Sequence, residues 1–92
     1  MNSQTARSLL LEDANDLING DRQAEYGTPQ ENFGRIADRW TQYLGVTIEP
    51  YDVAIMMMDL KLARLCNDVK RDSLVDIAGY AALAAELKER PE

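Results

Sequence analysis

Three charged side chains interrupt a long apolar segment, residues 53–66, and they are the first candidates for chemistry in this sequence. They are Asp59, Lys61 and Arg64. An unpaired charge is costly to bury, so each of them requires an opposite charge, a ligand or solvent. Lys61 and Arg64 lie about one turn apart on a helix, and they predict either a clamp for phosphate groups or two ordinary ion-paired edges. Asp59 stands among methionine and leucine residues, and we expect it to need a buried basic partner or a metal ion.

A second acidic group lies further along the chain. Asp72 and Asp76 are four residues apart and share one helical stripe with Gly79, beside Tyr80. Carboxylates at this spacing repel each other unless a Mg²⁺ ion or a basic side chain from another segment lies between them. The basic candidates are Arg22, Lys61 and Arg64. The candidate Mg²⁺ ligands are Asp59, Asp72 and Asp76, although Asp72 is also explained as a helix cap.

Gly79 carries a separate prediction. A glycine in the middle of a helix costs roughly 1 kcal/mol relative to alanine. Its presence there predicts that another helix or a ligand approaches the backbone closely.

The segment before the second expected helix is polar and contains one aromatic residue. Arg22, Tyr26 and Asn32 are candidates to line a pocket, and Gly27 is expected to adopt a positive φ. The first amides of a helix that begins at Pro29 are candidates to meet an anion. The alternative is a plain connector whose Tyr26 packs on the core.

Proline and glycine residues divide the chain into the elements that must position these side chains. Apolar residues at helical spacing predict four helices, over residues 3–19, 29–44, 50–67 and 73–89. The third is apolar almost all round, so we expect it to pack against several neighbours or against another subunit. The sequence therefore predicts an all-α fold: one domain over residues 1–92, a four-helix bundle completed by oligomerisation.

Composition excludes several functional classes. The 92 residues are 46% hydrophobic and 28% charged, with a net charge of −6, one cysteine and no histidine. This balance argues against disorder and against binding to nucleic-acid backbones or anionic membranes. No apolar run is long enough to span a membrane, and the first residues do not resemble a secretory signal. We therefore expect a cytoplasmic protein, and its small size favours self-association.

Four segments together resemble a known pattern: residues 22–27, 31–33, 59–64 and 72–80. The pattern is similar to small phage and prophage domains of unassigned function, which are distantly similar to the MazG-like all-α nucleoside triphosphate pyrophosphohydrolases. This resemblance implies a helical dimer or higher oligomer with a nucleotide pocket between helices. In those enzymes paired acidic residues hold Mg²⁺, and a metal-activated water attacks a phosphoanhydride. Asp59, Asp72 and Asp76 do not reproduce the paired spacing.

Three functions follow as hypotheses. The first is a phage-type, nucleotide-handling domain that acts as a Mg²⁺-dependent pyrophosphohydrolase in the host cytoplasm. The second is a non-catalytic protein that sequesters a nucleotide or cyclic nucleotide and so counters host defence signalling. The third is a structural helical oligomer. The expected nucleotide-binding residues are Arg22, Tyr26, Asn32, Lys61, Arg64 and Tyr80. Converging carboxylates would favour hydrolysis, whereas Lys, Arg and Tyr without them would favour sequestration.

Overall fold

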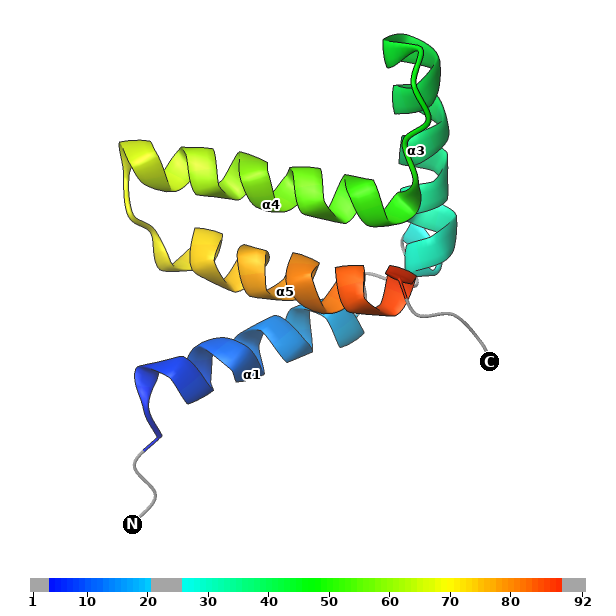
Figure 1. The fold of residues 1–92 in the computed structure, drawn as a ribbon. Coiled ribbons are helices and arrows are strands. Elements are labelled where there is room, and N and C mark those ends of the chain that lie inside the picture. Colours follow the sequence, from blue (N-terminus) through cyan, green and yellow to red (C-terminus); the bar gives the residue numbers. More distant parts are fainter. Residues whose placement is uncertain (1–3, 21–25, 89–92) are drawn as a thin grey trace.

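The computed structural model describes residues 4–20 and 26–88, which form four α-helices and contain no strand (Figure 1). These helices are α1 (Ala6–Asn19), α3 (Pro29–Leu44), α4 (Pro50–Asn67) and α5 (Arg71–Lys88). The expected all-α class is confirmed, and the bounds of α3 and α4 agree with the predicted ranges. Figure 1 shows α4 and α5 as an antiparallel pair. α1 lies along the side of α5 that faces away from α4, and α3 crosses the end of the pair where α4 begins and α5 ends.

The first and last helices begin elsewhere than predicted. α1 begins at Ala6 because the Thr5 hydroxyl caps it, accepting a hydrogen bond from the Ser8 backbone N–H at 3.2 Å. α5 begins at Arg71, so Asp72 lies inside its first turn and the expected cap at Asp72 is wrong. Arg71, the first residue of α5, lies 2.7 Å from Asp13 of α1 and forms an ion pair with it.

The start of α3 is fixed by a reciprocal capping box. The Thr28 hydroxyl accepts from the Glu31 backbone N–H, and the Glu31 carboxylate accepts from the Thr28 N–H. Pro29 occupies the first turn, where a missing N–H costs nothing. Gly27 has a φ of 86°, as expected, and turns the chain into the helix.

The core lies where α3 crosses the end of the α4–α5 pair. Its buried members are Phe33, Ala37, Val53, Ala54, Leu83 and Ala84. Several are alanines, which let the helix backbones approach closely. The ring of Phe33 lies 6.3 Å from that of Tyr80, a tilted arrangement typical of packed aromatic pairs.

Gly79 lies where α1 packs closely against α5. A Cβ atom placed on Gly79 would lie 3.2 Å from Cγ2 of Ile18. Close helix packing, one of the two explanations for this glycine, is therefore realised in the structure. The contact positions the end of α1 beside the middle of α5.

One sequence expectation about burial is wrong. Asp59 is exposed rather than buried, and the cysteine of the same helix, Cys66, is also exposed. Both lie on parts of α4 that no described segment covers. No helix in the described part of the chain is sufficiently long and apolar to cross a membrane.

Candidate functional site

A half-buried ion pair joins α4 to α5. The Lys61 ammonium lies 2.9 Å from the Asp76 carboxylate, and the two side chains are 17% and 29% exposed. Lys61 faces α5 because it falls on the same side of α4 as the buried Ala54, seven residues earlier. The pair therefore satisfies the charge of Asp76 with a basic side chain from another helix, one of the alternatives that the spacing of Asp72 and Asp76 left open.

This ion pair lines a pocket of about 160 Å³ between α1, α4 and α5, which we name the Lys61–Asp76 pocket. Its other lining residues are Leu17, Ile18, Gly79, Tyr80 and Leu83. Gly79 allows α1 to come near, so that the end of α1 forms one wall. The pocket thus combines a cation, a carboxylate and an aromatic ring with an aliphatic wall.

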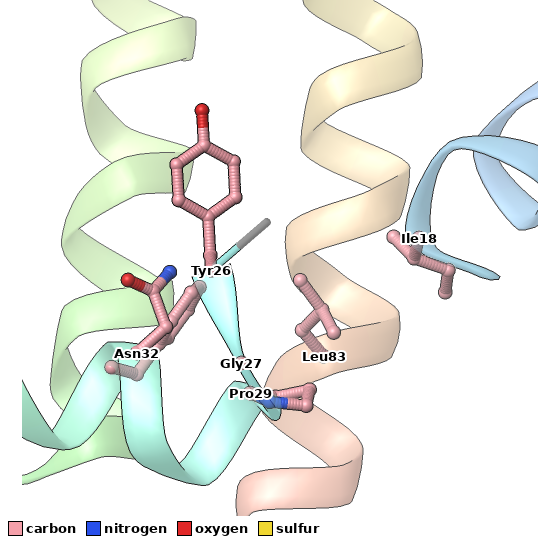
Figure 2. A pocket seen from close by; sticks show the side chains of 7 residues that line it. Ile18, Tyr26, Gly27, Pro29, Asn32 and Leu83 are labelled. Carbon is pink, nitrogen blue, oxygen red and sulfur yellow. The ribbon is translucent and has the colours of Figure 1, made fainter. Parts of the chain in front are cut away.

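A smaller pocket of about 20 Å³ adjoins the first, and we name it the Tyr26–Asn32 pocket. It is lined by Ile18, Tyr26, Gly27, Pro29, Asn32, Phe33 and Leu83. In Figure 2, Tyr26 and Asn32 lie side by side opposite Leu83, with Ile18 of α1 beyond it. Ile18 and Leu83 line both pockets, so the two pockets share a wall.

The structure brings together five of the residues expected to matter. Lys61, Asp76 and Tyr80 line the larger pocket, and Tyr26 and Asn32 line the smaller one. The Tyr26 carbonyl accepts a hydrogen bond of 2.7 Å from Arg35, which ties the chain before α3 to that helix.

The other expected residues lie elsewhere. Arg64 is exposed and lines a hollow at the turn between α4 and α5, together with Asp68 and Lys70. It does not pair with Asp68, which lies 3.9 Å from Lys70 instead. The clamp expected from Lys61 and Arg64 is therefore not formed, because Lys61 turns inward to α5. Arg22 lies outside the described residues.

Two of the three predicted Mg²⁺ ligands lie together, and the third does not. Asp72 and Asp76 line one hollow with Asp13, whose carboxylate pairs with Arg71, whereas Asp59 is exposed on α4. In the described part of the chain, no three acidic or thiol side chains are placed to hold a metal ion. These residues do not match the paired carboxylates that hold Mg²⁺ in the MazG-like pyrophosphohydrolases that the sequence resembles.

The start of α3 does not offer the anion site that was expected there. Pro29 has no N–H, and the Glu31 N–H already donates to the Thr28 hydroxyl. The Glu31 carboxylate also lies at this end of the helix, where it repels an anion. Its hydrogen bond from the Thr28 backbone holds the pKa of Glu31 below the ordinary value, with smaller contributions from the Thr28 hydroxyl and Arg35.

Sequence reasoning missed the contribution of α1 to the site. Leu17 and Ile18 line the larger pocket, yet they read as ordinary members of an apolar helical stripe. The available signal was Gly79, whose missing side chain predicted a close neighbour without identifying it.

Comparisons with known proteins add a family. Residues 9–88 match the family described as "Domain of unknown function (DUF6378)". The chain is 44% identical over 81 residues to the Gene 55 protein of Mycobacterium phage L5. The aligned region covers 86% of this chain and 52% of that protein. It is 42% identical over 83 residues to the Gene 55 protein of Mycobacterium phage D29, covering 89% of this chain and 55% of that protein.

The chain thus spans about half the length of these phage relatives. No solved structure matches it. Since the family match includes α1, α3, α4 and α5 almost completely, the pockets described above lie within it. The chain therefore belongs to the DUF6378 family and is similar to phage proteins.

Proposed function

We propose that this domain binds a nucleotide or cyclic nucleotide in the Lys61–Asp76 pocket and does not hydrolyse it. The observation that carries this proposal is the half-buried Lys61–Asp76 pair at 2.9 Å, placed in the wall of a pocket beside Tyr80. An ion pair that lines a pocket can contact a ligand as well as join two helices. Charged side chains in a cleft are good candidates for ligand contacts.

The chemistry of the pair suits the polar edge of a base or a ribose. A lysine ammonium has three N–H donors, and the contact with Asp76 uses one of them. The remaining donors are available to a carbonyl or phosphate oxygen, and the Asp76 carboxylate can accept from an amino or hydroxyl group. Tyr80 and the aliphatic Leu83 supply an apolar surface for a ring.

The size of the site indicates how a nucleotide would lie. A cavity of about 150 Å³ holds one six-membered ring, and the larger pocket measures about 160 Å³. We therefore place the base in the Lys61–Asp76 pocket and the sugar and phosphate groups toward its open side. One cation paired with one carboxylate leaves little net positive charge, which disfavours burial of a triphosphate.

Binding without turnover is the better of the two nucleotide hypotheses. Hydrolysis by the mechanism that the resemblance implies needs several carboxylates around one metal ion. Around the larger pocket, the described residues provide Asp76 alone, and Lys61 already neutralises it. A phage protein of this kind would act by lowering the free concentration of a nucleotide signal in its host.

A thermal-shift screen tests the proposal. The chain is melted with nucleoside mono- and triphosphates and with cyclic nucleotides, with and without Mg²⁺. A ligand that binds only the folded state stabilises it by about 2.7 kcal/mol at a concentration 100 times its Kd, so the Tm should rise measurably. We expect at least one nucleotide to raise the Tm without releasing phosphate or pyrophosphate.

Two lysine variants locate the effect. Lys61→Met should abolish the ligand-induced rise in Tm, measured against the variant's own ligand-free Tm. Lys70→Met is the matched control, because Lys70 pairs with Asp68 at 3.9 Å on the exposed turn. Equal responses of both variants, or no response of the wild type to any nucleotide, would overturn the proposal. Pyrophosphate release in Mg²⁺ would instead favour the hydrolase.

A further inference from the structure

Two side chains carry all the charge that the described residues bring to the Lys61–Asp76 pocket. They are Lys61 of α4 and Asp76 of α5, and the other described lining residues are aliphatic, aromatic or glycine. A base held in this pocket therefore has its polar edge matched to one ammonium and one carboxylate. Which base fits depends on the order of hydrogen-bond donors and acceptors that these two groups present.

The ion pair presents three hydrogen-bonding atoms in a defined order. A lysine ammonium only donates, and an ionised carboxylate only accepts, through two oxygens. The Lys61 ammonium lies 2.9 Å from Oδ2 of Asp76, so the order is one donor followed by two acceptors. Cytosine has the same order along its pairing edge, where the N4 amino group donates and N3 and O2 accept. The base that complements this order is guanine.

We propose that the Lys61–Asp76 pocket selects guanine among the bases. O6 of guanine accepts from the Lys61 ammonium, and the N1–H and the 2-amino group donate to the two oxygens of Asp76. Both contacts involve an ionised partner, and such hydrogen bonds are stronger than those between neutral groups. This inference rests on the proposed function and names the class of nucleotide that the same pocket takes.

The other bases satisfy fewer of these atoms. Adenine, cytosine and hypoxanthine each offer the pair one acceptor and one donor, so one oxygen of Asp76 is left over. Uracil and xanthine place a carbonyl oxygen opposite that oxygen, and two acceptors repel. Lys61 and Asp76 are only 17% and 29% exposed. Water therefore replaces a missing partner poorly, and each mismatch costs affinity.

The apolar part of the pocket agrees with this orientation. The pocket measures about 160 Å³, and a cavity of about 150 Å³ holds one six-membered ring. The pairing edge of guanine belongs to its six-membered ring, whereas the ribose is attached to the five-membered ring. The six-membered ring can thus enter while the ribose stays on the open side. Tyr80 supplies an aromatic surface, and its own ring packs 6.3 Å from that of Phe33.

The test compares bases that differ in single groups. Isothermal titration calorimetry measures binding of the 5′-monophosphates of guanosine, inosine, adenosine and xanthosine, and of their 3′,5′-cyclic forms. The guanosine form should bind the wild type at least about 10-fold more tightly than the inosine form, which lacks only the 2-amino group. It should also bind more tightly than the adenosine and xanthosine forms. This comparison needs no variant, so it does not depend on how a substitution affects folding.

A single substitution should then change the preferred base. Asp76→Asn keeps the shape of the side chain but replaces one acceptor oxygen with an amino donor. The order becomes donor, acceptor, donor, which complements the O6, N1–H and O2 of xanthine. Asp76→Asn should therefore bind the xanthosine form at least about 10-fold more tightly than the guanosine form. Asp68→Asn is the matched control, because Asp68 pairs with Lys70 on the exposed turn, and it should keep the wild-type preference.

The outcomes separate this inference from the function on which it rests. Equal binding of the adenosine and guanosine forms by the wild type would overturn guanine selection and leave nucleotide binding in place. The same conclusion would follow if Asp76→Asn, folded by circular dichroism, kept the preference for guanosine. If no nucleotide of the panel binds, the proposed function fails and the inference fails with it.

Discussion

Lys61 of α4 and Asp76 of α5 form the one ion pair of the described residues in which both side chains are less than a third exposed. Its atoms are 2.9 Å apart, and it stands at the edge of a pocket rather than in a closed core. Partial burial strengthens the attraction relative to a surface pair and raises the cost of leaving either charge alone.

The first prediction concerns the stability that this pair provides. Lys61→Met should lower the free energy of unfolding by about 1–2 kcal/mol, because it leaves the half-buried Asp76 carboxylate without a partner. Lys70→Met should change it by less than about 0.5 kcal/mol, since that pair is exposed and long. Urea denaturation followed by circular dichroism gives both values. A loss of the same size in the two variants would show that the Lys61–Asp76 pair is no stronger than a surface contact.

The second prediction uses two glycines that both lie inside helices. A Cβ on Gly34 would meet no atom within 4 Å, so Gly34→Ala should stabilise the fold by about 1 kcal/mol through helix propensity. On Gly79 the same Cβ would lie 3.2 Å from Ile18, so Gly79→Ala should gain less or lose stability. Thermal melting of the two variants measures the difference. Equal gains would mean that α1 does not approach α5 as closely as the structure shows.

The third prediction is a pH dependence at the start of α3. The backbone N–H of Thr28 holds the pKa of Glu31 below its ordinary value near 4.5. Ionised Glu31 therefore stabilises the fold above about pH 4.5, and this contribution is lost as the pH falls through the pKa of the folded state. Glu31→Ala should lower the Tm at about pH 7, and its difference from wild type should shrink as the pH falls through the lowered pKa of Glu31 in the folded state.

A carboxylate elsewhere provides the control for this effect. Glu12 is exposed on α1, and its carboxylate makes no hydrogen bond or ion pair with the described residues. Glu12→Ala should therefore leave the pH profile of the Tm close to that of the wild type. If the two variants have the same profile, the capping box does not contribute the pH dependence.

Local sequence signals for helix starts were sufficient to predict the bounds of the two central helices, α3 and α4. Pro29 and Pro50 each open a helix with acidic residues in the first turn, so α3 and α4 have the predicted bounds. They were not sufficient for α5, where Asp72 was expected to cap the helix. The helix starts at Arg71, and Arg71 pairs with Asp13 of α1. A contact 58 residues away in sequence leaves no trace in the local pattern.

The part of the site that depends on charge pairing was predictable from the sequence. Lys61 and Asp76 lie among apolar residues, so each required an opposite charge, and in the structure they pair with each other. Asp59 was misassigned for a physical reason: a helix that is apolar all round does not reveal which of its faces the chain covers. That distinction depends on the path of α3, which leaves the outward side of α4 open.

The most direct test of nucleotide binding is to identify the residues whose environment changes when a nucleotide is added. Backbone amide resonances of the isotope-labelled chain are followed by NMR while the nucleotide that raises the Tm most is added. We expect the largest shifts at Leu17, Gly79 and Tyr80, which surround the Lys61–Asp76 pocket, and little change at Tyr43 on the far end of α3. Shifts confined to the neighbourhood of Tyr43, or absent throughout, would contradict the claim that this pocket binds a nucleotide.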